Sequence, residues 1–336
     1  MCNNVSRGTP TEGICAVAKR LSAGERLTLP ENHVISNKQL TLSCGVADLG
    51  DGDVIRLGHG ESVYCGSYIE ITRDKVRVVE YLTEPTVHRE LEHGLCLGGH
   101  LCVAIDVGYA SASITLSSGG AVFESGVLEG CWSGRNGEIF VYGEGTSLSD
   151  VTLRWSCSDL KRDIWLLGDS YFNPTSPMRW TSYLIKNGYT DYLLSGFPGR
   201  DSVAALRDFK QLLTYGTPRY AVWCMGMNNE DKSDGISPSY LSSTEEFIAI
   251  CRDRGIIPIL ATIPCVPERI NSFKNAWVRA SGLRYVDLAV AVGAVDDGSS
   301  WYDGLLHADR VHPDVLGARA LYAGFITDFP EIMGRS

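Results

Sequence analysis

The chain has 336 residues, enough for about two domains at roughly 150 residues per domain. Hydrophobic residues make up 44% and charged residues 21% of it, which is ordinary globular usage and argues against a largely disordered chain. The formal net charge is −10, with neither a cluster of Lys and Arg nor a stretch approaching the ~18 apolar residues that span a bilayer. These features disfavour partners such as nucleic acids or anionic membrane surfaces, and they exclude membrane-spanning helices.

The N-terminal residues 1–6 carry neither the basic region nor the apolar region of a secretory signal, so we expect a cytoplasmic protein. A secreted protein or a lipoprotein trimmed to Cys2 is the alternative. The eleven cysteines include no CxxC pair, and Cys44, Cys65 and Cys102 lie in strand-like apolar runs, where a free Cys behaves as a small buried hydrophobe. A reducing compartment is therefore the preferred interpretation.

The first half of the chain is typical of an all-β fold. Short runs with alternating apolar residues are separated by Gly, Asp and Asn turn signals at spacings that suit a sandwich. The predicted strands span residues 40–44, 53–57, 62–69, 76–79, 101–107, 113–116, 138–142 and 151–155. We predict a jelly-roll-like β-sandwich over residues 1–160, with a polar connector at 156–162.

The pattern changes at Asp163, where compact apolar runs begin to alternate with helical segments. Strands are predicted at residues 164–167, 192–194, 220–225, 256–263 and 283–287, and helices at 178–186, 203–215, 239–254, 267–280 and 313–326. Strands that alternate with helices of this length indicate a parallel sheet. We therefore predict a three-layer α/β domain over residues 161–336, with helices on both faces of the sheet.

Polar groups with catalytic potential follow the strands of this second domain. In open α/β sheets, ligands bind outside the carboxyl ends of the strands. A serine, a glycine amide, an asparagine amide and an Asp–His pair are all expected at that edge, where they supply a nucleophile, oxyanion donors and an oriented base. They lie in Gly168-Asp169-Ser170, Gly196-Phe197-Pro198-Gly199, Gly226-Met227-Asn228-Asn229 and Asp309-Arg310-Val311-His312.

These four blocks, in this order, resemble those of SGNH/GDSL-type serine hydrolases over roughly residues 163–330. The resemblance implies that Ser170 is the nucleophile, that His312 is the base and that Asp309 orients it. It further implies an oxyanion hole formed by the Ser170 and Gly199 N–H groups and the Asn228 amide, with no cofactor. Asn229 stands where the family usually has Asp, which puts the local turn bonds in question.

The substrate is less well specified by the sequence. Tyr171, Phe172, Trp301, Tyr302 and His307 flank the motif residues and are possible substrate-binding residues, because aromatic rings stack on sugars as well as on acyl or aryl groups. No metal site is expected: the loosely spaced His88, His93 and His100 lack matching Cys or carboxylate ligands.

A β-sandwich that precedes an SGNH domain is similar to the arrangement in carbohydrate esterase family 2. We therefore expect a serine esterase that removes short acyl groups, acetyl above all, from carbohydrate substrates. One alternative is an SGNH hydrolase of the lysophospholipase or thioesterase kind. Another, of a different class, is a non-catalytic carbohydrate-binding protein. The oligomeric state is left open.

Overall fold

A computed structural model describes residues 4–7, 14–32, 38–62, 65–81, 84–108, 111–130, 137–173, 179–229, 231, 235–295 and 301–334. Contacts within the chain divide it into two compact units, Met1–Ser158 and Asp159–Ser336. The division falls two residues before the sequence-predicted boundary. Each unit has its own buried core.

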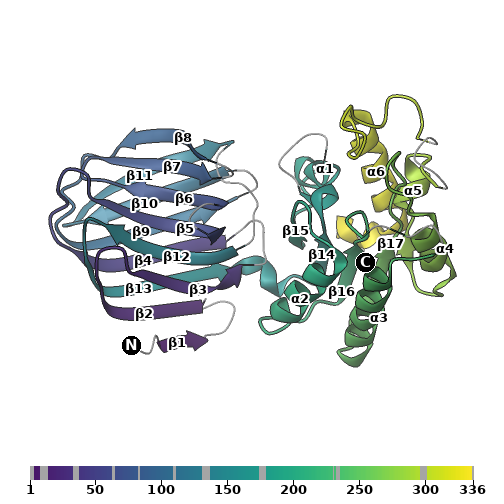
Figure 1. Ribbon diagram of the computed structural model, residues 1–336, viewed down its shortest axis with the longest axis horizontal. Coiled ribbons are helices and arrows are strands. Elements are labelled where there is room, and N and C mark those ends of the chain that lie inside the picture. The colour runs from purple at the N-terminus through teal and green to yellow at the C-terminus, as the bar shows by residue number, and fades with distance from the viewer. Residues whose placement is uncertain are drawn as a thin grey trace. The chain divides into compact units, whose positions relative to one another are not determined.

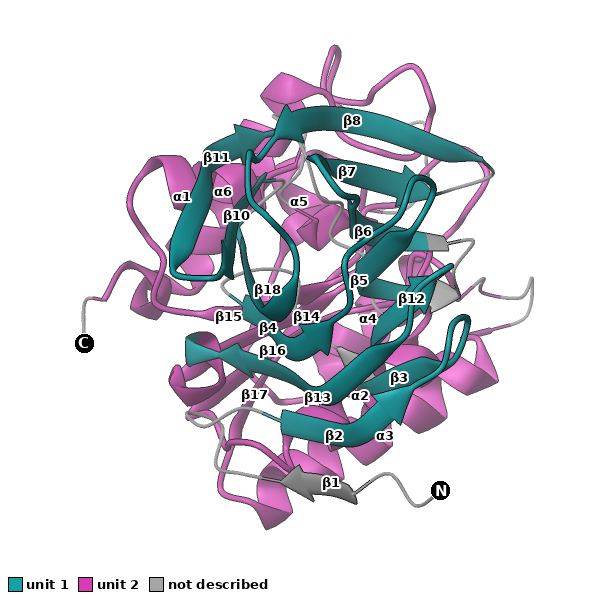
Figure 2. Ribbon diagram, turned by 90° about the vertical axis from the view of Figure 1, so that its left-hand side faces the viewer, with its two compact units in different colours: residues 1–158 teal, residues 159–336 magenta. Residues whose placement is uncertain are grey.

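The first unit consists of two antiparallel sheets, which Figure 2 shows as two layers, in agreement with the predicted β-sandwich. One sheet contains, in spatial order, β1 (Asn4–Arg7), β2 (Ile14–Leu21), β13 (Leu148–Cys157), β4 (Lys38–Val46), β9 (Gly99–Val107), β10 (Ser111–Ser118) and β11 (Ala121–Glu129). The other contains β3 (Arg26–Asn32), β12 (Gly137–Glu144), β5 (Val54–Ser62), β6 (Cys65–Ile71), β7 (Lys75–Tyr81) and β8 (Pro85–Glu92). Alternate residues of the inner strands are buried, as in β4, so one face of each sheet forms the core.

Cysteines do not cross-link the described part of either unit. None of those whose side chains are described is in a disulfide: Cys15, Cys44, Cys96, Cys102, Cys157, Cys224, Cys251 and Cys265. Cys44 is fully buried, as predicted, whereas Cys102 is partly exposed. Cys2, Cys131 and the side chain of Cys65 lie outside the described residues.

The second unit is built on a parallel sheet (Figure 1), which confirms that prediction. Its strands, in spatial order, are β15 (Leu193–Gly196), β14 (Ile164–Gly168), β16 (Tyr220–Cys224), β17 (Ile257–Ala261) and β18 (Tyr285–Val286). The helices are η1 (Ser158–Lys161), η2 (Ser170–Phe172), α1 (Thr181–Lys186), α2 (Ser202–Leu212), α3 (Pro238–Asp253), α4 (Ser272–Ala280), α5 (Leu288–Ala291), α6 (Val315–Asp328) and η3 (Pro330–Met333). None of the described helices is long and apolar enough to cross a membrane.

The strand order places a topological switch point between β14 and β16. The chain leaves β14 in one direction to form β15 and then returns past it to form β16, β17 and β18. Helices α2 and α3 pack together, and α1 and α6 pack together, which gives a layer of helices on each face. Loops diverge at a switch point, so the carboxyl ends of β14 and β16 are where a ligand is expected.

Candidate active site

Ser170 lies directly beyond the carboxyl end of β14, at the switch point. Asp169 begins the short helix η2, and its carboxylate accepts the N–H of Tyr171 at 2.9 Å. This cap fixes the backbone on either side of Ser170, the first residue of η2. Ser170 is buried to 9% exposure, so its hydroxyl is held in a defined environment rather than on a mobile surface.

The Ser170 hydroxyl begins a chain of two hydrogen bonds. Its Oγ lies 2.8 Å from Nε2 of His312, and Nδ1 of His312 lies 2.8 Å from Oδ2 of Asp309. With a proton on Nδ1 for Asp309 to accept, Nε2 is left unprotonated and faces the serine. The structure therefore brings together the three side chains that the sequence motifs singled out for nucleophilic chemistry.

A short closed turn carries both Asp309 and His312. The N–H of His307 donates to the carbonyl of His312 at 2.9 Å, and Leu306 pairs with Pro313. Inside the turn, the other oxygen of Asp309 accepts the N–H groups of Val311 and His312, each at 2.9 Å. The backbone therefore fixes the carboxylate before the imidazole binds to it.

The charges of the Asp309–His312 pair follow from these contacts. Burial raises the pKa of Asp309, but the bonds from the His312 and Val311 N–H groups and from the His312 ring outweigh it, and the pKa lies well below its usual range. Burial lowers the pKa of His312 below its ordinary value, although the bond to Asp309 acts in the opposite direction. At neutral pH the pair is thus a carboxylate and a neutral imidazole, the form in which His can accept a proton.

Asp169 is a second unusual carboxyl group beside the nucleophile. It is 1% exposed, and this burial raises its pKa to about 7, against the Tyr171 N–H bond and the positive charges of Arg179 and Arg269. The Asp169 side chain is therefore only partly ionised at neutral pH.

Gly199 supplies a free backbone N–H beside the switch point. Residues 197–200 form a tight turn, in which the Arg200 N–H donates to the Phe197 carbonyl at 3.3 Å. Gly199 has φ +74°, which the third position of a turn with a preceding Pro198 requires and which favours glycine. Among the described residues, neither the Gly199 N–H nor the Ser170 N–H has a hydrogen-bond acceptor.

Asn228 follows β16, and one of its two amide hydrogens has no acceptor among the described residues. Its Nδ2 donates to the carbonyl of Arg200 at 2.9 Å, and its Oδ1 accepts from Nη1 of Arg269 at 3.0 Å. The neighbouring Asn229 forms the local bonds that its departure from the family pattern had put in question. Its Oδ1 accepts the Ser202 N–H at 2.9 Å, and its Nδ2 donates to Ser239 at 3.2 Å.

Two of the expected substrate-binding residues belong to the protein interior. Tyr171 is 2% exposed, and its hydroxyl donates to the carbonyl of Val311 at 2.5 Å. Phe172 has no exposed surface and packs edge-on against Trp180, with ring centroids 4.8 Å apart. The expectation that they touch a substrate is corrected: Tyr171 ties η2 to the turn that carries His312, and Phe172 fills the core.

Of the other three candidates, one is buried and two are exposed. Trp301 is 8% exposed and donates from its indole nitrogen to the Cys265 carbonyl at 2.6 Å, so it too is an anchor rather than a binding surface. Tyr302 is exposed, and His307 is partly exposed. Nδ1 of His307 accepts the Asp309 N–H at 3.2 Å, which leaves Nε2 without a partner in the described part of the chain. Tyr302 and His307 remain candidates for substrate contact.

Comparisons with known proteins give only partial structural similarities. No family model matches the chain, and no curated protein matches it. Among solved structures, TesA is 20% identical over 50% of this chain and 98% of that chain, with a TM-score of 0.40. A lipase/acylhydrolase from Enterococcus faecalis is 24% identical (52% and 96% covered, TM-score 0.39), and the acetyl xylan esterase AlAXEase is 17% identical (49% and 98% covered, TM-score 0.39). Similarities of this size carry no argument about activity, which rests on the geometry above.

Arg269 is a residue of this site that the sequence motifs did not indicate. The prediction placed it inside a helix over 267–280, but α4 begins only at Ser272, and Arg269 lies in the loop after β17. It reaches the end of β16, where it contacts Asn228, 41 residues earlier in the chain. No spacing rule links an arginine in one loop to an amide in another, so no sequence signal pointed to it.

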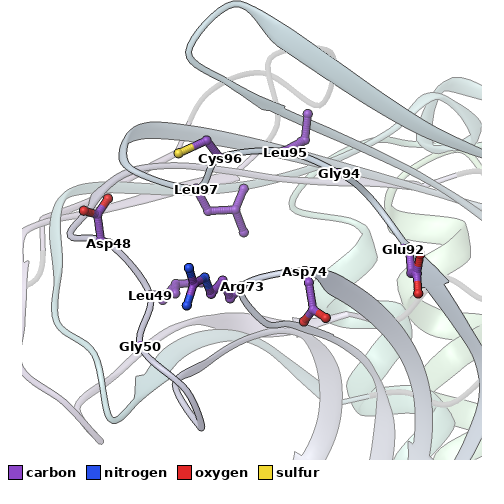
Figure 3. A pocket seen from close by; sticks show the side chains of 10 residues that line it. All are labelled: Asp48, Leu49, Gly50, Arg73, Asp74, Glu92, Gly94, Leu95, Cys96 and Leu97. Atoms are coloured by element: carbon purple, nitrogen blue, oxygen red, sulfur yellow. The ribbon is translucent and has the colours of Figure 1, made fainter.

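The first unit contains a pocket of its own, with a volume of about 640 Å³. Loops and the end of β8 supply three carboxylates and one guanidinium, and Figure 3 shows Leu97 extending into the hollow between them. The lining residues are Asp48, Leu49, Gly50, Arg73, Asp74, Glu92, Gly94, Leu95, Cys96 and Leu97. None of these ten is aromatic, so this pocket lacks the ring that sugar stacking uses. Neither in this pocket nor elsewhere do the described residues contain a group of three or more His, Cys, Asp or Glu side chains that could hold a metal ion.

Proposed function

We propose that this protein is a serine hydrolase that cleaves carboxylic esters through an acyl-enzyme intermediate. The observation that carries the proposal is the hydrogen-bonded series from Ser170 Oγ through the His312 ring to Asp309, with 2.8 Å at each step. A serine hydroxyl is a poor nucleophile at neutral pH, and an adjacent neutral imidazole is what activates it.

The reaction follows from the placement of these groups. Ser170 Oγ attacks the ester carbonyl while His312 Nε2 takes its proton, and Asp309 stabilises the imidazolium that forms. The carbonyl oxygen becomes an anion, which the N–H groups of Ser170 and Gly199 and the free amide hydrogen of Asn228 bind. His312 then gives its proton to the leaving alcohol, and a water molecule activated in the same way releases the acid. A single oxyanion donor typically contributes about 3–4 kcal/mol to the barrier reduction.

A short acyl group fits the surroundings of the nucleophile better than a long one. The large apolar side chains nearest Ser170 in the chain and in the Gly199 turn, Tyr171, Phe172 and Phe197, are all buried and used in packing. They are not available to line a channel for a fatty acyl chain.

For the alcohol side we propose a carbohydrate hydroxyl, with acetyl as the acyl group. The exposed ring of Tyr302 and the free Nε2 of His307 offer a stacking surface and a hydrogen-bonding group to a sugar. Analysis of acetate released from acetylated oligosaccharides tests this assignment. Binding of the oligosaccharides without release of acetate would favour the alternative of a non-catalytic carbohydrate-binding protein.

The decisive test of the reaction is Ser170→Ala. We expect kcat for p-nitrophenyl acetate to fall at least about a thousandfold, because members of such a triad act as a unit. Circular dichroism checks that the variant is folded. A folded Ser170→Ala protein that retained most of its activity would rule out the mechanism.

The preferred length of the acyl group is measured with a series of p-nitrophenyl esters whose acyl chains have two to eight carbons. Each methylene buried in a true apolar channel contributes about 0.8 kcal/mol, so a channel would make kcat/KM rise along the series. We expect kcat/KM to fall instead. A rising series would replace the short-acyl proposal with the lysophospholipase or thioesterase alternative.

A further inference from the structure

The side-chain amide of Asn228 is held by two hydrogen bonds, one from a donor and one to an acceptor. Its oxygen accepts from Arg269 Nη1 at 3.0 Å, and one of its hydrogens goes to the Arg200 carbonyl at 2.9 Å. One amide hydrogen is left, and this is the hydrogen that the proposed reaction requires for the oxyanion. The direction of this hydrogen depends on which way round the amide sits.

The two neighbours together exclude the reversed amide. A guanidinium only donates and a backbone carbonyl only accepts. If the Asn228 side chain were turned over, its NH₂ group would face Arg269 and its oxygen would face the Arg200 carbonyl. Both contacts would then be repulsive, and the amide oxygen would take the place of the donor. Arg269 and the Arg200 carbonyl therefore act together so that Asn228 presents a hydrogen rather than an oxygen, and Arg269 is the side chain of the two that a substitution can remove.

Arg269 is itself firmly placed. The same Nη1 that bonds Asn228 also donates to the carbonyl of Met227 at 3.0 Å. Its backbone is paired with Val266, with the two N–H···O bonds at 2.9 and 3.0 Å. A positive charge against the amide oxygen also polarises the amide, which makes the remaining N–H a stronger donor.

We propose that Arg269 is a positioning residue, which orients and polarises the Asn228 amide so that it stabilises the oxyanion. This inference rests on the proposed esterase function and extends it to a residue that does not itself touch the substrate. The effect should appear in the transition state, where the negative charge develops, and much less in the binding of the neutral ester.

The surroundings of Arg269 make a chemical test possible. A polar pocket of about 350 Å³ opens beside it, lined by Asp201, Asn228, Asn229, Ser237, Ser239 and Arg269. Truncation of Arg269 to alanine would enlarge this pocket by the volume of the side chain. A guanidinium ion from solution could then occupy the vacated place, with Asp201 as a nearby carboxylate.

The experiment uses the whole chain and p-nitrophenyl acetate. In Arg269→Ala we expect kcat to fall about 10- to 100-fold with little change in KM, somewhat less than loss of an oxyanion donor itself. Guanidinium chloride at tens of millimolar, far below the molar concentrations that unfold proteins, should restore part of kcat, whereas equal sodium chloride should not. If the alanine variant folds poorly, Arg269→Gln, which keeps a polar side chain, replaces it in the test. We expect the same fall in kcat for Arg269→Gln.

Two further variants make the result specific. Arg254→Ala removes a guanidinium whose one hydrogen-bond partner among the described residues is a backbone carbonyl, Leu213 O at 3.4 Å. Arg254 lies just before the amino end of β17, whereas Arg269 follows the carboxyl end of that strand, so guanidinium should not change the activity of this variant. In Asn228→Ala, the additional Arg269→Ala substitution should cost little, because its effect passes through Asn228.

The outcomes separate this inference from the proposed function. If Ser170→Ala is inactive but Arg269→Ala keeps the wild-type kcat, the role of Arg269 is overturned and the esterase proposal stands. The same holds if the Asn228→Ala and Arg269→Ala losses multiply, or if guanidinium restores nothing. If Ser170→Ala remains active, both proposals fall.

Discussion

The imidazole of His312 is subject to opposing effects on its pKa. Removal from water favours the neutral ring, the bond to Asp309 favours the charged ring, and the positive charge of Arg179 again favours the neutral one. Burial has the largest effect, so the pKa lies below its ordinary value. An unusually acidic Asp309 remains ionised throughout the pH range in which this imidazole titrates.

The pH dependence of the reaction follows from that balance. His312 must be neutral to take the proton of Ser170, so kcat/KM should rise with pH as the His312 ring loses its proton. Because the pKa is lowered, the midpoint should lie below the reference value of ~6.5. Rates for p-nitrophenyl acetate between about pH 4 and 8 measure it.

Asp309→Asn is the companion variant for this profile. Its kcat should fall strongly with little change in KM, because the ring loses the acceptor that fixes its tautomer. For the wild-type protein, a midpoint of the pH profile at or above ~6.5 would contradict the argument that burial lowers the pKa of His312. A nearly silent Asp309→Asn would mean that another group orients His312.

The residues that act locally were the ones the sequence could predict. Asp309 and His312 lie three positions apart in one turn, and Ser170 comes shortly after the apolar run 164–167, so all three fall in sequence blocks that resemble those of the SGNH/GDSL-type hydrolases. The buried role of Tyr171 depends on a carbonyl 140 positions later, and that of Arg269 on an amide in another loop. Such pairs depend on how the loops meet, which no local pattern contains.

Among the elements, α6 fixes the turn that carries the Asp–His pair. Asp314 caps the helix, and its N–H donates to the Leu305 carbonyl at 2.7 Å. Gly317, in the first turn of α6, lies so close to Leu305 that a Cβ there would overlap the Leu305 carbonyl oxygen and approach Pro313 Cβ at 3.0 Å. The helix can therefore lie against this turn only because the residue at position 317 has no side chain.

Gly317→Ala tests that close approach. In an exposed helix the substitution would stabilise by about 1 kcal/mol. Here we expect a lower Tm and a reduced kcat, because the turn from Leu305 to Pro313 must shift and move His312 from Ser170. Thermal unfolding and p-nitrophenyl acetate hydrolysis measure the two effects. An increased Tm with unchanged kcat would contradict the contact.

Element prediction succeeded for the strands of the parallel sheet and was incomplete for those of the β-sandwich. The five strands of the parallel sheet were all predicted, because each contains a buried apolar run. The prediction gave no strand for β1, β2 and β3 at the start of the chain, nor for β8 and β11. β8 and β11 are the last strands of their sheets, and most of their side chains are exposed. Polar edge strands lack the alternation that reveals inner strands, and the same polarity protects them from pairing with other chains.

On the scale of the whole molecule, every group assigned to the reaction belongs to the second unit. The parallel sheet, its helices and the residues from Ser170 to His312 all lie within Asp159–Ser336. The first unit has a separate core between its two sheets. The hydrolysis of a small ester should therefore need only the second unit.

A protein of residues 159–336 alone tests this division. We expect it to fold and to hydrolyse p-nitrophenyl acetate with a kcat within a few-fold of the full chain. Activity on an acetylated polysaccharide, measured beside it, reports whether the first unit contributes to large substrates. A folded but inactive 159–336 protein would show that the site requires the first unit.

The hydrogen bond between Ser170 and His312 joins residues 142 positions apart, and this separation affects the protein as it is made. At translation rates of about 5–20 residues per second, roughly seven to thirty seconds pass between the synthesis of the serine and that of the histidine. Throughout that time Ser170 has no base and is an ordinary alcohol. On the proposed mechanism, the nascent chain therefore cannot attack esters around the ribosome until the 305–313 turn folds back onto η2.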